Sequence, residues 1–185
     1  PGLDPGALVA AIRALGFAEV VEVALGADLV SEAYRELLER EPDLWHIATA
    51  CPAVAEYVRR YNPALCDRLV PVVSPMVATA RLVHAVRPAP LRCVFIGPCV
   101  AKKLEARDPL LPPEVDEVLT FQELNRLFAQ QGIEPEDCAP EPFDLDVAGM
   151  GRAFPLVGGL MNCAGMERRL LSTRAMGLSG QGETT

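Results

Sequence analysis

The stretch Leu91–Glu105, LRCVFIGPCVAKKLE, is the part of the sequence that best indicates the fold. Its residues 93–96 form a short apolar run, typical of a strand that is buried on both faces of a sheet. A Gly-Pro pair ends this run, and Cys99 then precedes a segment of good helix formers. The pattern places the thiol at the carboxyl edge of a sheet, where the first N–H groups of a helix favour a thiolate. Cys99 is therefore a candidate metal ligand or nucleophile, and Lys102 lies on the same helical face.

The same arrangement occurs twice more, closer to the N-terminus. Residues 45–50 are predicted as a strand, and Cys51 follows it directly in front of a predicted helix. Residues 69–73 are predicted as a third strand, and Ser74 follows it in front of another helix. Because the carboxyl ends of parallel strands meet at one edge of a sheet, we expect Cys51, Ser74 and Cys99 to lie there.

Predicted helices and strands alternate along the chain with short connections, which indicates right-handed crossovers. We therefore predict an α/β fold of two lobes, each with a mostly parallel sheet flanked by helices, and a cleft between the lobes. The Pro-Ala-Pro segment at 88–90 predicts the boundary, so that the lobes are residues 1–89 and 90–185. The remaining predicted elements are helices over 6–15, 29–41 and 121–131 and strands over 17–24 and 115–119, with Thr120 and Glu123 as a capping box.

Composition excludes several classes of function. The chain has 185 residues, half of them apolar, and a net charge of −8, which argues against binding of nucleic acid. No apolar run approaches the ~18 residues that a membrane helix needs. The six cysteines include no CxxC pair, so a self-contained zinc site is not indicated. We predict a cytoplasmic protein that binds neither nucleic acid nor membranes.

Two local patterns have more than one interpretation. Gly158 and Gly159 stand in front of a predicted helix, where they either let backbone N–H groups approach an anion or cofactor or permit tight packing. Cys51 and Cys99 are either paired ligands or two cysteines that happen to end strands. A thiol enzyme that uses Cys99 alone is a further alternative.

Taken in order, these motifs resemble those of the catalytic H-domain of iron-only hydrogenases. The family motif T-S-C-C-P-x-W is similar to Thr49–Val54, with one cysteine missing, and M-P-C-x-x-K-x-x-E is similar to Gly97–Glu105. The family's glycine-pair segment is similar to Phe154–Met161, and the whole resemblance runs from about residue 8 to about residue 180.

The resemblance implies a role for each motif residue. The two cysteines would bind the 4Fe–4S part of the H-cluster, the lysine would contact a cyanide ligand of the di-iron subcluster, and the serine would belong to the proton route. The catalytic residues are then Lys102, Ser74 and Glu105, the metal ligands are Cys51 and Cys99, and the cofactor-binding residues are these two cysteines with Lys102, Gly158 and Gly159.

The departures from the family pattern affect the expected function. Ala50 replaces the cysteine that passes protons to the di-iron site, and the third motif, which supplies the other two cluster ligands, is absent. We expect a fragment of a longer protein with ferredoxin-type or sensor domains, and no cluster in this fragment by itself. The expected chemistry is interconversion of protons and H₂, or sensing of H₂. The alternative is a non-catalytic iron–sulfur sensor or interaction module on the same scaffold.

Overall fold

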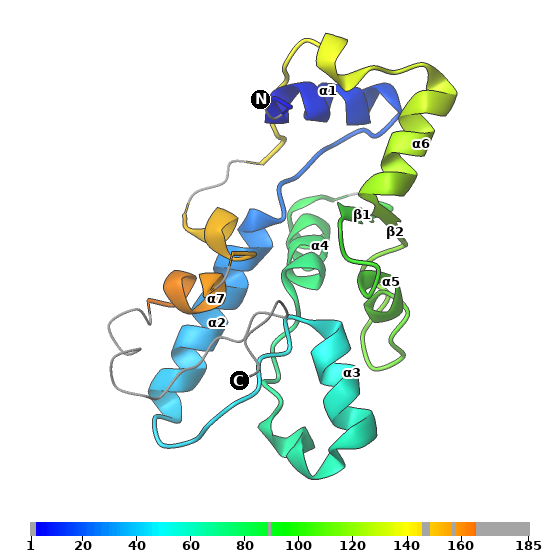
Figure 1. Cartoon of the computed structure of the whole chain (residues 1–185). Coiled ribbons are helices and arrows are strands. Elements are labelled where there is room, and N and C mark those ends of the chain that lie inside the picture. The colour runs from blue at the N-terminus through cyan, green and yellow to red at the C-terminus, as the bar shows by residue number, and fades with distance from the viewer. Residues whose placement is uncertain (1–2, 89, 146–148, 157, 166–185) are drawn as a thin grey trace, which may run out of the picture. The chain divides into compact units, whose positions relative to one another are not determined.

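The chain folds into two compact units, which a computed structural model shows in Figure 1. The structure describes residues 3–88, 90–145, 149–156 and 158–165. Unit 1 consists of Pro1–Glu22 and Leu91–Val147, and unit 2 of Val23–Pro90 and Ala148–Thr185. The described structure consists of helices and parallel strands, so the predicted α/β class is confirmed.

Unit 1 contains the sheet that the Leu91–Glu105 stretch predicts. Strands β1 and β2 pair in parallel over four residues, from Val94 opposite Glu117 to Gly97 opposite Thr120. Helices α1 and α6 bring Ala11, Ile12, Leu124 and Phe128 together in a buried core. The elements of unit 1 are α1 (Pro5–Ala14), β1 (Val94–Gly97), α5 (Lys102–Glu105), β2 (Glu117–Thr120), α6 (Phe121–Gln131) and η2 (Pro135–Asp137).

Local signals define the ends of the helices in unit 1. The carboxylate of Asp4 accepts hydrogen bonds from the N–H groups of Gly6 and Ala7 at the start of α1. Thr120 and Glu123 form the predicted capping box at the start of α6, and Gly132 ends that helix with φ +65°. Each of these caps satisfies backbone groups that the helix itself leaves unpaired.

Unit 2 is built around the long helix α2, which packs against α4. Val30, Tyr34 and Leu37 of α2 form the buried core with Val70 and Ala78. Close approach of the two helices requires a glycine, because a Cβ on Gly26 would lie 2.3 Å from the carbonyl oxygen of Pro75. The elements of unit 2 are α2 (Ala24–Arg40), α3 (Pro52–Tyr61), η1 (Pro63–Arg68), α4 (Pro75–Val86), η3 (Gly151–Ala153) and α7 (Gly159–Cys163).

Three predicted strands are wrong in extent or in kind. Residues 17–22 are irregular, because the N–H of Val20 binds the carboxylate of Asp144 rather than a neighbouring strand. The predicted strands over 45–50 and 69–73 are reduced to one parallel bridge between Ile47 and Leu69. Apolar alternation favours a strand locally, but it does not supply the partner that a ladder needs.

Each unit combines two separate stretches of chain, whereas the predicted lobes were continuous. One change of unit falls at residues 90–91, beside the predicted boundary, and two others fall at 22–23 and 147–148. The reason is that α1 buries its apolar face against α6, so the N-terminal helix packs with elements far along the sequence. Residues 166–185 of the predicted second lobe lie outside the described part. No helix in the described part is long and apolar enough to cross a membrane.

Candidate functional site

Cys51 stands at the first candidate junction, as the N-cap residue of α3. Its backbone is extended, and Pro52 occupies the first turn of this ten-residue helix. The thiol is exposed, is not in a disulfide and makes no capping hydrogen bond. The side chain is therefore accessible, next to the unpaired N–H groups that favour an anionic ligand at a helix N-terminus.

Side chains hold the segment that leads into Cys51. The hydroxyl of Tyr34 accepts a hydrogen bond from the N–H of Thr49 at 2.8 Å. The Thr49 hydroxyl in turn lies 2.8 Å from the carbonyl oxygens of both Val70 and Val72. Thr49, two residues before Cys51, thus connects α2 with the segment that leads to α4.

Cys99 stands at the second candidate junction, two residues after the end of β1. Its carbonyl accepts a hydrogen bond from the N–H of Lys102, the first residue of α5, across a turn at Val100 and Ala101. The thiol is exposed and is not in a disulfide. The predicted strand, Gly-Pro stop and helix are all present here, although α5 has only four residues.

Lys102 and Glu105 form a buried ion pair on α5. The Lys102 ammonium lies 2.6 Å from the Glu105 carboxylate, and both side chains are almost entirely buried. Removing two charges from water costs several kcal/mol per ion, so each group depends on the other for compensation. Glu105 therefore fixes where the ammonium of Lys102 lies.

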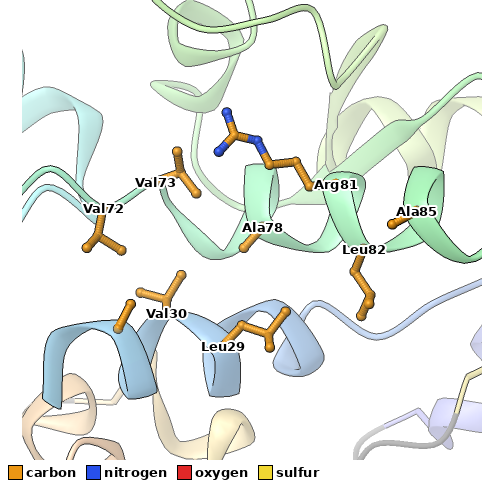
Figure 2. Close-up of a pocket in the computed structure, with 9 residues that line it drawn as sticks. Leu29, Val30, Val72, Val73, Ala78, Arg81, Leu82 and Ala85 are labelled. Carbon is orange, nitrogen blue, oxygen red and sulfur yellow. The ribbon is translucent and has the colours of Figure 1, made fainter. Parts of the chain in front are cut away.

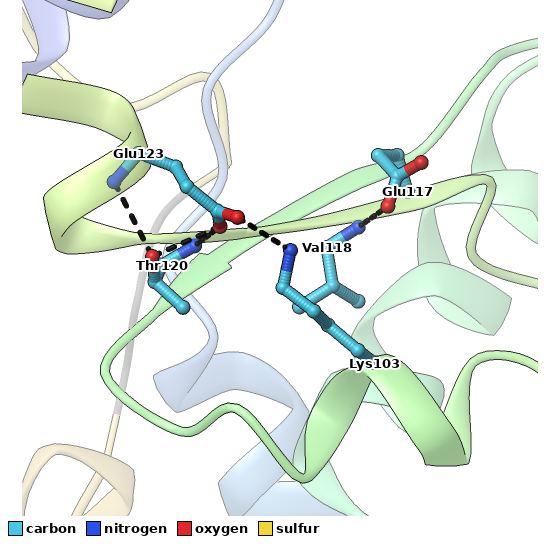
Figure 3. A network of polar contacts seen from close by, with 5 residues as sticks. All are labelled: Lys103, Glu117, Val118, Thr120 and Glu123. Atoms are coloured by element: carbon cyan, nitrogen blue, oxygen red, sulfur yellow. Dashed lines mark hydrogen bonds and ion pairs between the residues drawn. The ribbon is translucent and has the colours of Figure 1, made fainter. Parts of the chain in front are cut away.

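A second ion pair connects α5 to α6. Lys103 donates to the Glu123 carboxylate at 2.9 Å, and that carboxylate also accepts from the N–H and the hydroxyl of Thr120 (Figure 3). The Thr120 N–H, then Lys103 and the Thr120 hydroxyl, lower the pKa of Glu123 from its ordinary 4.5 to about 2. The helix after Cys99 is thus joined to the capping box at the end of β2.

Ser74 is the N-cap residue of α4 and is only 1% exposed. Its hydroxyl has no hydrogen-bond partner among the described residues. The neighbouring Val73 lines a groove of about 370 Å³ between α2 and α4, which Figure 2 shows. The residues that line this groove are Leu29, Val30, Ala33, Val72, Val73, Ala78, Arg81, Leu82 and Ala85. Eight of these nine are apolar, so the groove offers few groups that carry protons.

The glycine pair stands at the start of a helix, as predicted, but that helix is short. Gly158 adopts φ +72° at the N-cap of the five-residue α7. A Cβ on Gly159 would lie 2.0 Å from the carbonyl oxygen of Ala153, so a side chain does not fit there. Tight packing accounts for Gly159, and the assignment of both glycines to cofactor binding stays a prediction.

The predicted site residues divide between the two units. Unit 1 contains Cys99, Lys102 and Glu105, and unit 2 contains Cys51, Ser74 and the glycine pair. The predicted meeting of Cys51, Ser74 and Cys99 at one edge of a sheet therefore stays a prediction. In the described ranges, no group of three or more His, Cys, Asp or Glu side chains is placed to hold a metal ion.

Two of the other cysteines are in surroundings that disfavour a thiolate. Burial, with the carboxylates of Asp116 and Glu114, raises the pKa of Cys93. Burial also raises the pKa of Cys163, whose thiol donates to the carbonyl oxygen of Met150 at 3.0 Å. Neither thiol resembles the exposed thiols of Cys51 and Cys99.

Comparison with known proteins identifies the family of this chain. The family model described as "Iron only hydrogenase large subunit, C-terminal domain" matches residues 3–178. The chain belongs to this family. The motifs at Cys51 and Cys99, the buried Lys102 and the glycine pair all fall within the matched residues.

The relatives are considerably longer than this chain. Iron hydrogenase 1 of Clostridium pasteurianum is 28% identical over 182 residues, which cover 88% of this chain and 32% of the relative. The cytosolic Fe–S cluster assembly factor NAR1 of Eremothecium gossypii is 33% identical over 113 residues, which cover 59% of this chain and 25% of the relative. A variant of the apo FeFe-hydrogenase from Chlamydomonas reinhardtii has a similar structure, with TM-score 0.74 and 28% identity over 96% of this chain and 50% of that chain. The chain thus spans about a third of the length of the first relative and half of the solved structure.

Proposed function

We propose that this chain contributes Cys51 and Cys99 to a 4Fe–4S cluster of an H-domain that interconverts protons and H₂ or senses H₂. The observation that carries the proposal is the pair of equivalent junctions. Each has an exposed thiol between a segment that pairs in parallel and a helix, with Cys51 directly before α3 and Cys99 separated from α5 by a two-residue turn. The motif resemblance also implies that both thiols stand at positions of the family's cluster ligands.

The residues present fit such a cluster in part. Cysteine thiolates are the ordinary ligands of iron–sulfur clusters, and about four are needed. Cys51 and Cys99 supply two, and the described residues contain no group of three or more His, Cys, Asp or Glu side chains placed to hold a metal ion. The remaining ligands would come from outside the described residues, as expected for a chain that spans half of a solved relative.

When bound, the cluster would supply electron transfer, and a di-iron subcluster would supply the site of H₂ chemistry. Lys102 would hold a positive charge toward the anionic cyanide ligand that the family's lysine contacts. Glu105 supports this role because its carboxylate fixes the ammonium at 2.6 Å. Cys51 and Cys99 would bind and orient the cluster.

Two features favour slow turnover. Ala50 has a methyl group where the family has a proton-carrying thiol, and a positioned proton donor typically contributes a factor of about 10²–10⁴. The hydroxyl of Ser74, the other proton-route residue, has no partner among the described residues and is almost fully buried. We expect Ala50→Cys to raise H₂ turnover of the cofactor-loaded protein, and wild-type activity equal to that of a metabolic hydrogenase would contradict this.

The second candidate is a non-catalytic iron–sulfur sensor or interaction module. Ala50 favours it, and so does similarity to a relative named as a cluster assembly factor. In either case we propose ferredoxin-type or sensor domains as partners and a cytoplasmic location.

Anaerobic reconstitution of the full-length protein with iron, sulfide and a di-iron compound that carries CO and cyanide, followed by removal of unbound compound and infrared spectroscopy, distinguishes these functions. Bands of bound CO and cyanide would support the hydrogenase-type site. A 4Fe–4S signal without those bands would support the non-catalytic module. Failure to retain any iron or sulfide would contradict both.

A further inference from the structure

A hydrogen-bonded pair of hydroxyl groups lies beside the segment that carries Cys51. Tyr34 belongs to α2, is 4% exposed, and packs in the core of unit 2. Its hydroxyl accepts from the N–H of Thr49 at 2.8 Å and lies 3.3 Å from the Thr49 hydroxyl oxygen. A tyrosine buried this deeply needs such partners, because an unpaired buried hydroxyl is costly.

The hydrogens of this pair have one consistent arrangement. The Thr49 hydroxyl is 2.8 Å from the carbonyl oxygens of Val70 and Val72, which only accept, so it donates its hydrogen to them. Tyr34 then donates to the oxygen of Thr49 and accepts from its N–H. Burial is the main cause that raises the pKa of Tyr34, which keeps this donor protonated.

Backbone pairing near Cys51 ends before this point. The bridge at Ile47 has two hydrogen bonds, from the Ile47 N–H to Arg68 and from the Val70 N–H to Ile47. Beyond it, Thr49 is attached through Tyr34, Val70 and Val72. Cys51 is two residues further on, at the start of α3.

We propose that Tyr34 is a positioning residue for Cys51: its hydroxyl, through Thr49, fixes the segment that presents the thiol to the cluster. The inference rests on the proposed function, since it assigns the supporting contacts of one proposed ligand. Groups that hydrogen-bond a metal ligand directly typically change metal affinity by about 10- to 100-fold when they are replaced, and we expect an effect in this range for Tyr34. Tyr34 lies outside all of the family motifs, so the motif resemblance does not assign it this role.

The test compares Tyr34→Phe with Tyr57→Phe in the full-length protein. Both changes remove one hydroxyl from a tyrosine in unit 2, but Tyr57 is 59% exposed and contacts the ring of Tyr61. In the cluster-free protein, hydrogen exchange over residues 45–51 should be roughly fivefold faster in Tyr34→Phe, the effect of one typical hydrogen bond. Exchange over residues 93–105, around Cys99, should not change in either variant.

The cluster-loaded protein gives the second readout. Iron loss to a chelator should be about 10- to 100-fold faster in Tyr34→Phe than in wild type or Tyr57→Phe. Thr49→Ser, which keeps the hydroxyl, should retain iron as wild type does, and Thr49→Val should lose it as Tyr34→Phe does.

The outcomes separate this inference from the proposed function. Wild-type protein that retains a cluster, with equal iron loss from Tyr34→Phe and Tyr57→Phe, would overturn the inference and leave the proposed function standing. Equal iron loss from Thr49→Ser and Thr49→Val would also overturn it, because the hydroxyl would then not matter. Wild-type protein that takes up no cluster would overturn the proposed function and, with it, the inference.

Discussion

At the Cys99 junction, four consecutive residues of β1 pair with β2, whereas at the Cys51 junction a single bridge joins Ile47 to Leu69. The Cys51 junction compensates with side-chain hydrogen bonds, since Thr49 bonds both to Tyr34 on α2 and to the carbonyls of two residues ahead of α4. On the C-terminal side of the thiols, the Cys51 junction has the more extensive regular structure. Cys51 is followed by a ten-residue helix with proline in its first turn, and Cys99 by the four-residue α5.

The comparison shows that two similar thiols depend on different kinds of interaction. A ladder uses backbone groups that every residue except proline supplies, so the approach to Cys99 tolerates substitution. The approach to Cys51 depends on two hydroxyl groups. After Cys99, helix α5 is too short to be stable alone and depends on the Lys102–Glu105 pair.

The largest expected effect is the loss of the buried carboxylate on α5. Glu105→Ala should lower the free energy of unfolding by about 3–5 kcal/mol, because the buried Lys102 ammonium loses this charged partner. Denaturation by urea measures the change. The double variant Lys102→Met, Glu105→Leu should restore most of the stability, and a single variant as stable as wild type would show that α5 does not need the pair.

A smaller loss is expected on the Cys51 side. Thr49→Val keeps the shape of the side chain but leaves the Tyr34 hydroxyl and two carbonyl oxygens with one partner fewer. The free energy of unfolding should fall by about 1–3 kcal/mol. Thr49→Ser is the matched control and should lose less; if both variants unfold alike, the hydroxyl does not hold this junction.

At Thr120, the last residue of β2, we expect a loss of about 1 kcal/mol in the free energy of unfolding. Thr120→Ala removes the cap of α6 and one contact of Glu123, and N-cap threonines typically contribute this amount. Denaturation by urea should show the loss, while thiol labelling of Cys51 should be unchanged. A change in the labelling rate of Cys51 would show that the two junctions are not independent.

The smallest effect is a pH dependence that belongs to the Cys99 side. The folded protein lowers the pKa of Glu123 to about 2, so ionised Glu123 adds stability above its ordinary value of 4.5. This contribution should disappear as the pH falls from 4.5 toward 2. Thermal unfolding of Glu123→Gln should lack this component, and identical pH profiles for the variant and wild type would contradict the assignment.

Local signals explain which parts of the fold were predictable. The capping box at Thr120, the proline in the first turn of α3 and the glycine after α6 each act within one turn of helix, so the sequence displays them. The predicted strand over 17–24 failed because Asp144, far along the chain, binds the N–H of Val20.

The candidate site was predictable to a similar degree. Cys51, Cys99 and Lys102 follow short motifs, and the structure places each of the three at or near the start of a helix. Tyr34 was missed because a tyrosine within a helical pattern does not indicate a partner fifteen residues away. The buried contact between Lys102 and Glu105 was missed as well, because their spacing predicts one helical face and not whether that face is buried.

The central claim is that Cys51 and Cys99 bind the same cluster. The most direct test is the iron and acid-labile sulfide content of full-length Cys51→Ser and Cys99→Ser after anaerobic reconstitution, with Cys138→Ser as the control. We predict that each of the first two variants loses about four iron and four sulfide per chain relative to wild type, the content of one 4Fe–4S cluster, and that Cys138→Ser loses none. Full retention of iron and sulfide in either Cys51→Ser or Cys99→Ser would contradict the claim.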